Sequence, residues 1–460
     1  MAQSIKKQGM DMTEGEPFKL LIIYAFPILL GNLFQQLYNM CDTIIVGRLL
    51  GANALAAVGN TGPMNFLVLG FLYGMTSGFA VPTAQRFGAH DEKGLKESVA
   101  VNVILNAASG LVITILSCLL ALPLLKAIHT PQEILSQSFT YIFIIYLGIL
   151  TTVLYNACTC VLRAVGDSKT PLYFLIISSV LNIVLDIVFI LFCKWGVAGA
   201  AIATVLAQAV SGIASFVWIV LRYPILHVTR EDFKNAGFSI KKHLGIGLNM
   251  GFQFSITAIG TVILAGALNK FGATKIAAFT AAQKVEQLVT VAAIVMGVAM
   301  ANYAGQNMGA RKIKRIREGV AKSLIITLVV AVGAALLAWF FSDQMTSIFL
   351  DRSSVDENTW KEILEASKTY LRICAVFFPV LFVIFIFRNT LQGIGHGFWP
   401  LMGGVFELIA RSLAAYTLPV VMGFAGICAA EPLAWASAAF PLAIAYSVII
   451  RKVEKQLTAL

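Results

Sequence analysis

The chain has 460 residues, of which 58% are hydrophobic and only 12% charged, and its mean hydropathy is +0.82. Soluble globular proteins carry about 25% charged residues, so this composition excludes that class and indicates an integral membrane protein. The net charge of +11 does not predict nucleic-acid binding, because the basic residues are scattered between apolar segments, where they set membrane topology. A β-barrel is disfavoured, because the apolar stretches are long and continuous rather than alternating.

Charged, glycine and proline clusters divide the chain into apolar stretches of about the 20 residues that cross a hydrocarbon core. The first begins near Phe18 and is longer than a signal-peptide core, so we expect it to remain as the first span. The sequence therefore predicts an all-α polytopic membrane protein with twelve transmembrane helices. The predicted spans are 18–45, 54–82, 98–123, 134–160, 172–192, 197–220, 244–268, 275–303, 320–342, 366–390, 399–422 and 426–450.

The distribution of basic residues predicts the orientation of these spans. Most of the 34 lysines and arginines fall in segments that share one side of the membrane with the N-terminus. Those segments include the cluster from Arg311 to Lys322, and Arg388, at the end of the tenth span, is counted with them. Because the cytoplasmic side carries the excess of positive charge and the span count is even, both termini are predicted to be cytoplasmic.

An internal repeat divides the spans into two halves. A numbering offset of 221 aligns LGANALAAV (50–58) with FGATKIAAF (271–279), and an offset of 229 aligns LRAVGDSKTP (162–171) with LQGIGHGFWP (391–400). Six spans separate equivalent points, so the halves enter the membrane from the same side and form a parallel repeat, with a cavity expected between them. We predict an N-terminal lobe at 1–222, a cytoplasmic linker at 223–243 and a C-terminal lobe at 244–460.

Ionisable residues inside the predicted spans are candidate functional residues. Each costs roughly 2.5–3.5 kcal/mol at the bilayer centre, so each requires a partner or a function. The six residues of this kind are Asp42, Asp186, Glu286, Glu407, Arg411 and Lys284.

Four side chains are expected to converge in the first lobe. With a helical rise of about 1.5 Å per residue, Asp186, Thr204 and Asp42 reach a similar depth, and Asn182 lies one turn from Asp186 on the same helix face. Two carboxylates with neutral oxygens suit a hard cation such as Na⁺, or a shared proton, because two like charges disfavour full ionisation. The structural alternatives are an interfacial role for Asp42 and a hydrogen-bonded structural carboxylate at Asp186.

In the second lobe, Glu407 and Arg411 are spaced i, i+4 and can neutralise each other; the alternative is a role in substrate contact or secondary coupling. Glu286 and Lys284 are spaced i, i+2 and cannot pair on one helix face. One of these two is expected to face the cavity, where Glu286 would attract a cationic substrate; the alternative is a structural role.

Several motifs together resemble the multidrug and toxic compound extrusion family. They are FPILLGNLFQQLYNMCDTIIVGRLLGANALAAV (26–58), AQRFGAH (84–90), RAVGDSKTP (163–171), NIVLDIVFI (182–190), GVAGAAIAT (196–204) and AGQNMGA (304–310). The resemblance covers nearly the whole chain. It implies two six-helix lobes that open alternately and exchange inward Na⁺ or H⁺ for outward amphipathic organic cations.

The resemblance also implies roles for particular residues. It implies that Asp42, Asn182, Asp186 and Thr204 bind the coupling cation. It also implies that the first span bends at Pro27. Tyr141 and Asn156 in the fourth span, with Glu286, Glu407 and Arg411, are candidates for substrate contact or secondary coupling.

The sequence thus predicts a secondary antiporter of the cell membrane that works by alternating access, needs no cofactor beyond its coupling ion and functions as a monomer. The closest alternatives are a flippase for a lipid-linked substrate of the same superfamily and a major facilitator transporter. An enzyme is disfavoured, because the five histidines show no HExxH pattern.

Overall fold

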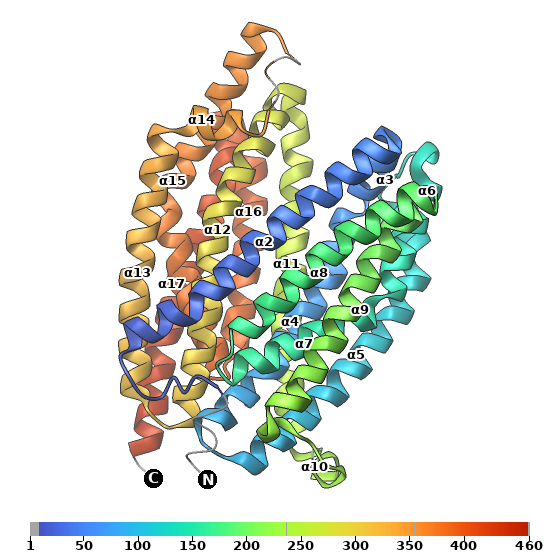
Figure 1. Ribbon diagram of the computed structural model, residues 1–460. Helices are drawn as coiled ribbons and strands as arrows, with labels where there is room; N and C mark the ends of the chain where they lie inside the picture. Colours follow the sequence, from blue (N-terminus) through green and yellow to red (C-terminus); the bar gives the residue numbers. More distant parts are fainter. Residues whose placement is uncertain (1–8, 236, 351, 353–354, 459–460) are drawn as a thin grey trace. The chain divides into compact units, whose positions relative to one another are not determined.

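The computed structural model describes residues 9–235, 237–350, 352 and 355–458, and every regular element within them is a helix (Figure 1). This confirms the predicted all-α fold. The helices are α2 (Pro17–Leu50), α3 (Ala52–Asn60), α4 (Gly62–Gly88), α5 (Glu92–Ala127), α6 (Gln132–Leu147), α7 (Ile149–Ala164), α8 (Lys169–Ile187), the π-helix η1 (Val188–Phe192), α9 (Gly196–Arg222), the 3₁₀ turn η2 (Pro224–Leu226), α10 (Arg230–Asn235), α11 (Gly237–Leu268), the 3₁₀ turn η3 (Asn269–Phe271), α12 (Gly272–Gly309), α13 (Ile313–Phe340), α14 (Ser342–Ser347), α15 (Glu357–Gly393), α16 (Phe398–Met422) and α17 (Phe424–Thr458).

The helices account for the predicted membrane spans. Ten helical stretches of the described residues are long and apolar enough to cross a membrane, and the bent pair α6 and α7 supplies an eleventh. One of the ten, Ser239–Gly309, has 71 residues, far more than the roughly 20 that cross a hydrocarbon core. It contains all but the first two residues of α11 and the whole of α12. Counting these two helices separately gives the twelve predicted spans.

The fourth predicted span is bent rather than straight. Gly148 separates α6 from α7, and the two helices differ in direction by 47°. A Cβ atom at Gly148 would lie 2.3 Å from Cγ2 of Val205 on α9. The absence of a side chain therefore lets α9 approach at the same residue where the helix bends.

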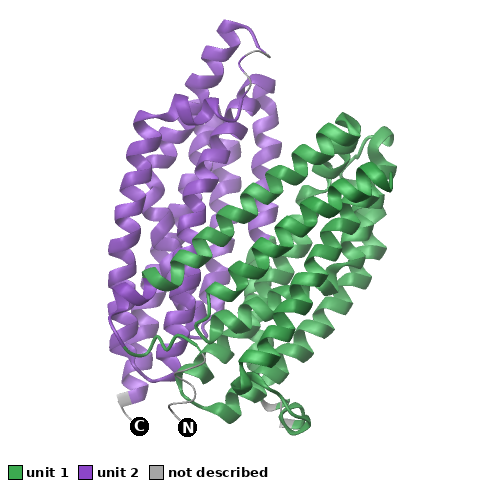
Figure 2. Cartoon of the chain, viewed as in Figure 1, with its two compact units in different colours: residues 1–14, 22–255 green, residues 15–21, 256–460 purple. Residues whose placement is uncertain are grey.

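Two compact units make up the chain (Figure 2). Unit 1 contains residues up to Glu14 and Ile22–Ser255, and unit 2 contains Gly15–Leu21 and Ile256–Leu460. Within unit 1, α7 packs on α4, α5 and α9; within unit 2, α15 packs on α12, α13 and α17. The structural division falls inside α11, whereas the predicted lobe boundaries follow the sequence repeat and stay a prediction.

The repeat is visible in backbone conformation. Gly51 and Gly272, related by the offset of 221, both have left-handed φ values, 86° and 79°. His90 and Arg311, related by the same offset, have φ values of 52° and 59°, which are uncommon for residues other than glycine. Equivalent turns therefore keep the same unusual geometry in both units.

A buried hydrogen bond is also repeated. In unit 1, the Ser138 hydroxyl donates to the carbonyl oxygen of Ala57 at 3.1 Å. In unit 2, the Ser367 hydroxyl donates to the carbonyl oxygen of Ala278 at 3.0 Å. The two alanines are related by the offset of 221 and the two serines by the offset of 229, so both offsets describe one structural repeat.

The first half of α11 packs closely on α4 inside unit 1. A Cβ atom at Gly74 would lie 2.5 Å from the carbonyl oxygen of Met250, and one at Gly78 would lie 2.6 Å from Cα of Gly247. A Cβ atom at Gly247 would lie 2.2 Å from the ring of Phe79. Glycines on both helices thus allow backbone contact, as is common between membrane helices.

A chain of buried polar side chains reinforces this contact. His243 Nε2 of α11 lies 2.8 Å from the Ser98 hydroxyl of α5, which lies 2.8 Å from the Thr83 hydroxyl of α4. The Asn102 amide donates to the Thr83 hydroxyl at 2.9 Å. Buried polar groups need such partners, so the network fixes the register of α11 against α4 and α5.

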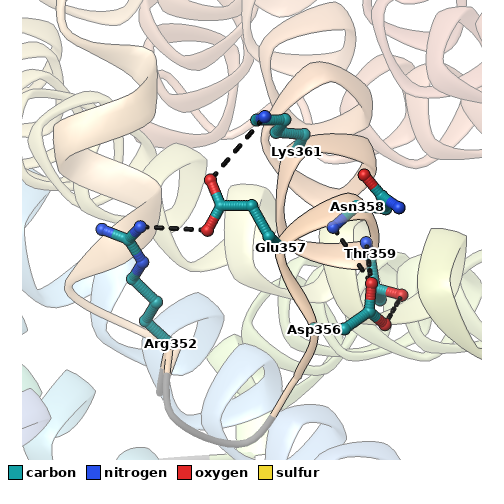
Figure 3. A network of polar contacts seen from close by, with 6 residues as sticks. All are labelled: Arg352, Asp356, Glu357, Asn358, Thr359 and Lys361. Atoms are coloured by element: carbon teal, nitrogen blue, oxygen red, sulfur yellow. Dashed lines mark hydrogen bonds and ion pairs between the residues drawn. The ribbon is translucent and has the colours of Figure 1, made fainter.

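The N-terminus of α15 is capped by a carboxylate (Figure 3). Asp356 accepts hydrogen bonds from the backbone amides of Asn358 and Thr359 and from the Thr359 hydroxyl. The Thr359 hydroxyl and these amides hold the pKa of Asp356 below its ordinary value. Beside the cap, Arg352 pairs with Glu357 at 3.0 Å, so the helix start is stabilised by local contacts.

Candidate functional site

The structure brings the predicted oxygen-bearing side chains together inside unit 1. Asn182 and Asp186 lie one turn apart on α8, with exposed fractions of 1% and 0%. The Asn182 amide fits with its nitrogen donating to Asp186 Oδ2 at 2.7 Å and its oxygen accepting from the Thr204 backbone amide at 3.1 Å. The Thr204 hydroxyl on α9 donates to the carbonyl oxygen of Ala200 at 3.1 Å.

Asp42 completes this group from α2. The carboxyl groups of Asp42 and Asp186 lie close enough to interact with each other, and two carboxyl groups can share a hydrogen bond only when one of them holds a proton. Among the described residues, Asp42 Oδ1 and Asp186 Oδ1 are buried and have no hydrogen-bond donor. The pair can therefore hold a proton, or its free oxygens can contribute to coordinating a hard cation.

Two tyrosines lie beside the acid pair. Tyr38, on α2, lies close enough to interact with Thr204 and with both acids. Tyr141 of α6 is 8% exposed and interacts electrostatically with both acids. Tyr141 was named from the sequence, whereas Tyr38 was missed, although it lies four residues before Asp42 and hence on the same helix face.

Asn156 and Pro27 lie elsewhere in unit 1. Asn156 is half-buried in α7, and among the described residues it takes no part in the hydrogen bonds of the acid pair. Pro27 is buried within α2, which runs continuously through it. One turn earlier, the Tyr24 hydroxyl donates to the carbonyl oxygen of Arg163 at 2.9 Å. The bending of the first span at Pro27 stays a prediction.

A π-helical turn follows Asp186 directly. The π-helix η1 begins at Val188, and such turns occur frequently at functional sites. Phe189 in this turn stacks on Trp195 with ring centroids 4.8 Å apart, and the Trp195 backbone amide donates to the Phe189 carbonyl oxygen at 3.0 Å. These contacts hold the helix irregularity next to the acid pair.

In unit 2, the buried charges pair across helices and not along one helix. Glu407 forms an ion pair with Arg388 of α15. Arg411 forms one with Glu431 of α17, with N–O distances of 2.8 and 2.9 Å. The expectation that Glu407 and Arg411 neutralise each other is therefore wrong as a description of their main partners, because arginines and glutamates of neighbouring helices are closer.

Two members of these pairs were not recognised as buried charges in the sequence. Arg388 was assigned to the cytoplasmic side but is 6% exposed within α15. Glu431 lies near the predicted start of the last span. The repeat offered a signal, because GVAGAAIAT (196–204) aligns with GFAGICAAE (423–431) and places Glu431 at the position of Thr204.

Glu286 and Lys284 lie on different faces of α12, as their i, i+2 spacing requires. Glu286 is 7% exposed and accepts a short hydrogen bond from Thr290 one turn further along α12. Lys284 is exposed. Glu286, not Lys284, therefore faces the interior of unit 2.

The MatE family model matches residues 27–188 and 246–417, one stretch in each half and more than half of the chain in total. The chain is 28% identical over 387 residues to probable multidrug resistance protein YpnP of Bacillus subtilis (strain 168), covering 84% of each sequence. It is 27% identical over 419 residues to probable multidrug resistance protein YoeA of the same organism, covering 88% of this chain and 89% of YoeA.

A solved structure extends the likeness to the whole fold. The crystal structure of MATE in complex with MaL6 superposes with a TM-score of 0.88 at 25% identity, covering 97% of this chain and 99% of that one. The family match, the multidrug resistance relatives and the paired repeats agree with the resemblance inferred from the motifs. The chain belongs to the MatE family of multi-pass membrane transporters, the multidrug and toxic compound extrusion family.

Proposed function

We propose that this protein is a secondary antiporter that exports amphipathic, mostly cationic organic molecules in exchange for H⁺ or Na⁺ moving inward. The names of YpnP and YoeA, probable multidrug resistance proteins, support the export of drug-like molecules. Membership of the MatE family disfavours the major facilitator alternative. A lipid-linked substrate remains the alternative substrate class for the same transport cycle.

One observation carries the proposed coupling site. Asp42 and Asp186 each have a buried carboxyl oxygen without a hydrogen-bond donor among the described residues. A full pair of negative charges in this setting is unfavourable unless a cation or a proton neutralises it. Asn182 and Thr204 supply neutral oxygens beside the pair, as Na⁺ coordination would also require.

The coupling step follows from this charge balance. Binding of the cation removes the repulsion between Asp42 and Asp186 and draws α2 toward α8. Pro27 lacks a backbone N–H, so its turn of α2 has one helical hydrogen bond fewer and bends at lower cost than the rest. Movement of α2 at Pro27 then links cation binding to release of the organic molecule. Tyr141 and Asn156 are the proposed contacts for that molecule in unit 1.

The proposed setting is the cell membrane, with both termini in the cytoplasm and the protein acting as a monomer. Substrate and ion cross the membrane without a covalent step, so no enzymatic reaction and no cofactor beyond the coupling ion are proposed.

The test is drug efflux from proteoliposomes under separately imposed pH and Na⁺ gradients. Asp42→Asn and Asp186→Asn are expected to abolish gradient-driven efflux, because a neutral amide pair does not need the cation. Glu133→Gln changes an exposed acid in the first turn of α6 and is the matched control, with efflux retained. Undiminished gradient-driven efflux in both aspartate variants would exclude this coupling site.

A further inference from the structure

One end of unit 2 carries a dense cluster of positive charge. It consists of the lysines and arginines of 311–322, at the start of α13, and of 451–455, near the end of α17; we call these residues the basic rim. The ion pair between Arg317 and Glu454, at 2.6 Å, joins the two helices there. The two segments contain nine basic residues and two glutamates. Eight of the nine are exposed and Arg315 is half-buried, so the basic rim forms an accessible surface.

The glutamates of these segments cannot balance this charge. Even when both are ionised, the segments keep an excess of seven positive charges. The guanidinium of Arg315 is held by the protein, because its Nε donates to Asn307 Oδ1 at 3.1 Å and it lies over the ring of Tyr303. The exposed members of the basic rim therefore carry most of the excess.

The equivalent turn of unit 1 lacks this charge. Under the offset of 221, residues 311–322 align with 90–101. The segment of unit 2 has six basic residues and one acid, whereas the segment of unit 1 has two lysines and three acids. Both turns keep a left-handed residue, His90 or Arg311, at the same position. The geometry of the turn therefore does not require the positive charge of unit 2.

In unit 1, acids stabilise this turn and the helix that follows it. Asp91 is the N-cap of α5 and accepts a hydrogen bond from the Gly94 backbone amide at 2.9 Å. Asp91 also pairs with Arg86 at 2.6 Å, and Glu92 pairs with Lys96 at 3.2 Å. Negative groups near a helix N-terminus are favourable, because that end carries a partial positive charge.

The start of α13 has no such acids. Lys312 occupies the N-cap position without a side-chain cap hydrogen bond, and the first turn of α13 contains no acid. A lysine side chain has no acceptor for the first backbone amides of the helix. The basic side chains and the helix end thus add to one positive potential, which favours an anion such as a phosphate group.

Exposed apolar faces begin next to the basic rim. On α13, Ile325 and Val329 lie three and seven residues after Lys322 and are 56% and 69% exposed. On α17, Val448 lies four residues before Lys452 and is 59% exposed. Residues with these spacings share one helix face. A phosphate bound at the basic rim by a molecule with acyl chains would therefore place those chains along apolar side chains, whereas free phosphate would leave these faces unused.

We propose that the basic rim binds the headgroups of anionic phospholipids. Their phosphate groups contact the basic side chains and the first amides of α13, and their acyl chains lie along the exposed faces of α13 and α17. The phosphates supply the negative charge that Asp91 and Glu92 supply in unit 1. Clusters of about four to eight lysines and arginines beside a membrane helix attract anionic lipids in this way. Binding does not depend on the proposed antiport.

The test measures binding of phosphatidylglycerol and of phosphatidylcholine to the purified full-length transporter by native mass spectrometry. Lys314→Gln/Arg317→Gln removes two positive charges from the basic rim. The matched control, Lys93→Gln/Lys96→Gln, removes two at the repeat-equivalent positions of unit 1. Each variant loses one ion-paired residue, Arg317 or Lys96, so the loss of an ion pair is common to both.

The wild-type protein is expected to bind phosphatidylglycerol more tightly than phosphatidylcholine, and less tightly as salt screens the charges. Lys314→Gln/Arg317→Gln should bind phosphatidylglycerol roughly 10–30-fold more weakly, and the control should bind it as the wild type does. Equal affinity for the two lipids, or an equal loss in the control, would overturn the proposal. Displacement of phosphatidylglycerol by millimolar inorganic phosphate would also overturn it, because the site would then recognise free phosphate.

Thermal unfolding with phosphatidylcholine alone checks that the variants fold. If Lys314→Gln/Arg317→Gln unfolds below the wild-type temperature, Lys314→Gln/Lys322→Gln takes its place, since both lysines are exposed and Arg317 stays paired with Glu454. The same loss of phosphatidylglycerol binding is expected in this variant. Wild-type affinity for phosphatidylglycerol in a folded variant of the basic rim would refute the assignment.

Discussion

The close packing of α11 on α4 predicts opposite effects for two alanine substitutions at nearby glycines. Gly247 and Gly245 both lie inside α11, so replacing either with alanine improves helix propensity by about 1 kcal/mol. Their surroundings differ. A Cβ atom at Gly247 would lie 2.2 Å from the Phe79 ring and 3.0 Å from the Met75 carbonyl oxygen, whereas one at Gly245 would meet nothing within 4 Å.

The overlap at position 247 determines how strongly Gly247→Ala destabilises the protein. Carbon atoms pack favourably at about 3.5–4.0 Å, so α11 or the ring must move by more than an ångström. Phe79 is fully buried, so the ring cannot move out into solvent. Overpacking of this kind typically costs about 1–3 kcal/mol, and the large overlap places Gly247→Ala at the upper end. After the gain in propensity, we expect a net loss of about 1–2 kcal/mol for Gly247→Ala and a gain of up to about 1 kcal/mol for Gly245→Ala.

The assay is thermal unfolding of each purified variant in the same detergent. A change of about 1 kcal/mol moves the midpoint by about 2–4 °C in a unit of about 150–250 residues, so the two variants should differ by roughly 2–12 °C. Gly78→Ala, whose Cβ atom would lie 2.6 Å from Cα of Gly247, should resemble Gly247→Ala. Equal midpoints for Gly247→Ala and Gly245→Ala would refute the inference that glycine permits this helix contact.

Three further predictions concern single features of the fold. Glu431→Gln leaves the buried Arg411 without its counter-ion and should cost about 3–5 kcal/mol in thermal unfolding; replacing both residues with methionine should restore most of the loss, and no recovery would contradict the pairing. Asp356→Ala should speed hydrogen exchange at the start of α15. Because the folded pKa of Asp356 lies below its ordinary value of 3.8, this cap is fully formed above that pH and weakens as the pH falls through the lower folded value; an unchanged exchange rate in the variant would argue against the cap. Gly148→Ala should destabilise the protein by about 1–3 kcal/mol, since its Cβ atom would overlap a valine of α9, and a stabilised variant would contradict the close contact there.

The sequence predicted the parts of the fold that depend on local pattern. Continuous apolar length predicted the twelve spans, and the offsets of 221 and 229 predicted a repeat that the structure shows in turns such as Gly51 and Gly272. The spacing of Asn182 and Asp186 predicted a shared helix face, and depth along the helices predicted that Asp42 and Thr204 reach the same level. Each of these inferences needs only helix geometry.

Pairing between helices was the part that spacing could not supply. Glu407 and Arg411 have the spacing of a helical ion pair, yet each is closest to a residue from another helix, Arg388 or Glu431. An arginine side chain is long enough to reach across a helix interface, so its partner depends on helix rotation and packing distance, which one sequence does not determine. The bend at Gly148 has the same origin, since it depends on how closely α9 approaches.

The two repeat-related clusters explain how one fold can combine a mobile and a fixed charge. In unit 1, Asn182 and Thr204 are neutral, so in the proposed mechanism a coupling ion that enters and leaves balances the charge of Asp42 and Asp186. In unit 2, Arg411 and Glu431 occupy the equivalent positions and form an ion pair with each other. Because Arg411 cannot lose its charge in a protein, it remains beside Glu431 as a built-in counter-ion, whereas unit 1 offers two carboxyl groups to the proposed coupling ion. On grounds of charge, the proposed main coupling role therefore falls to unit 1, where asparagine and threonine stand in place of Arg411 and Glu431.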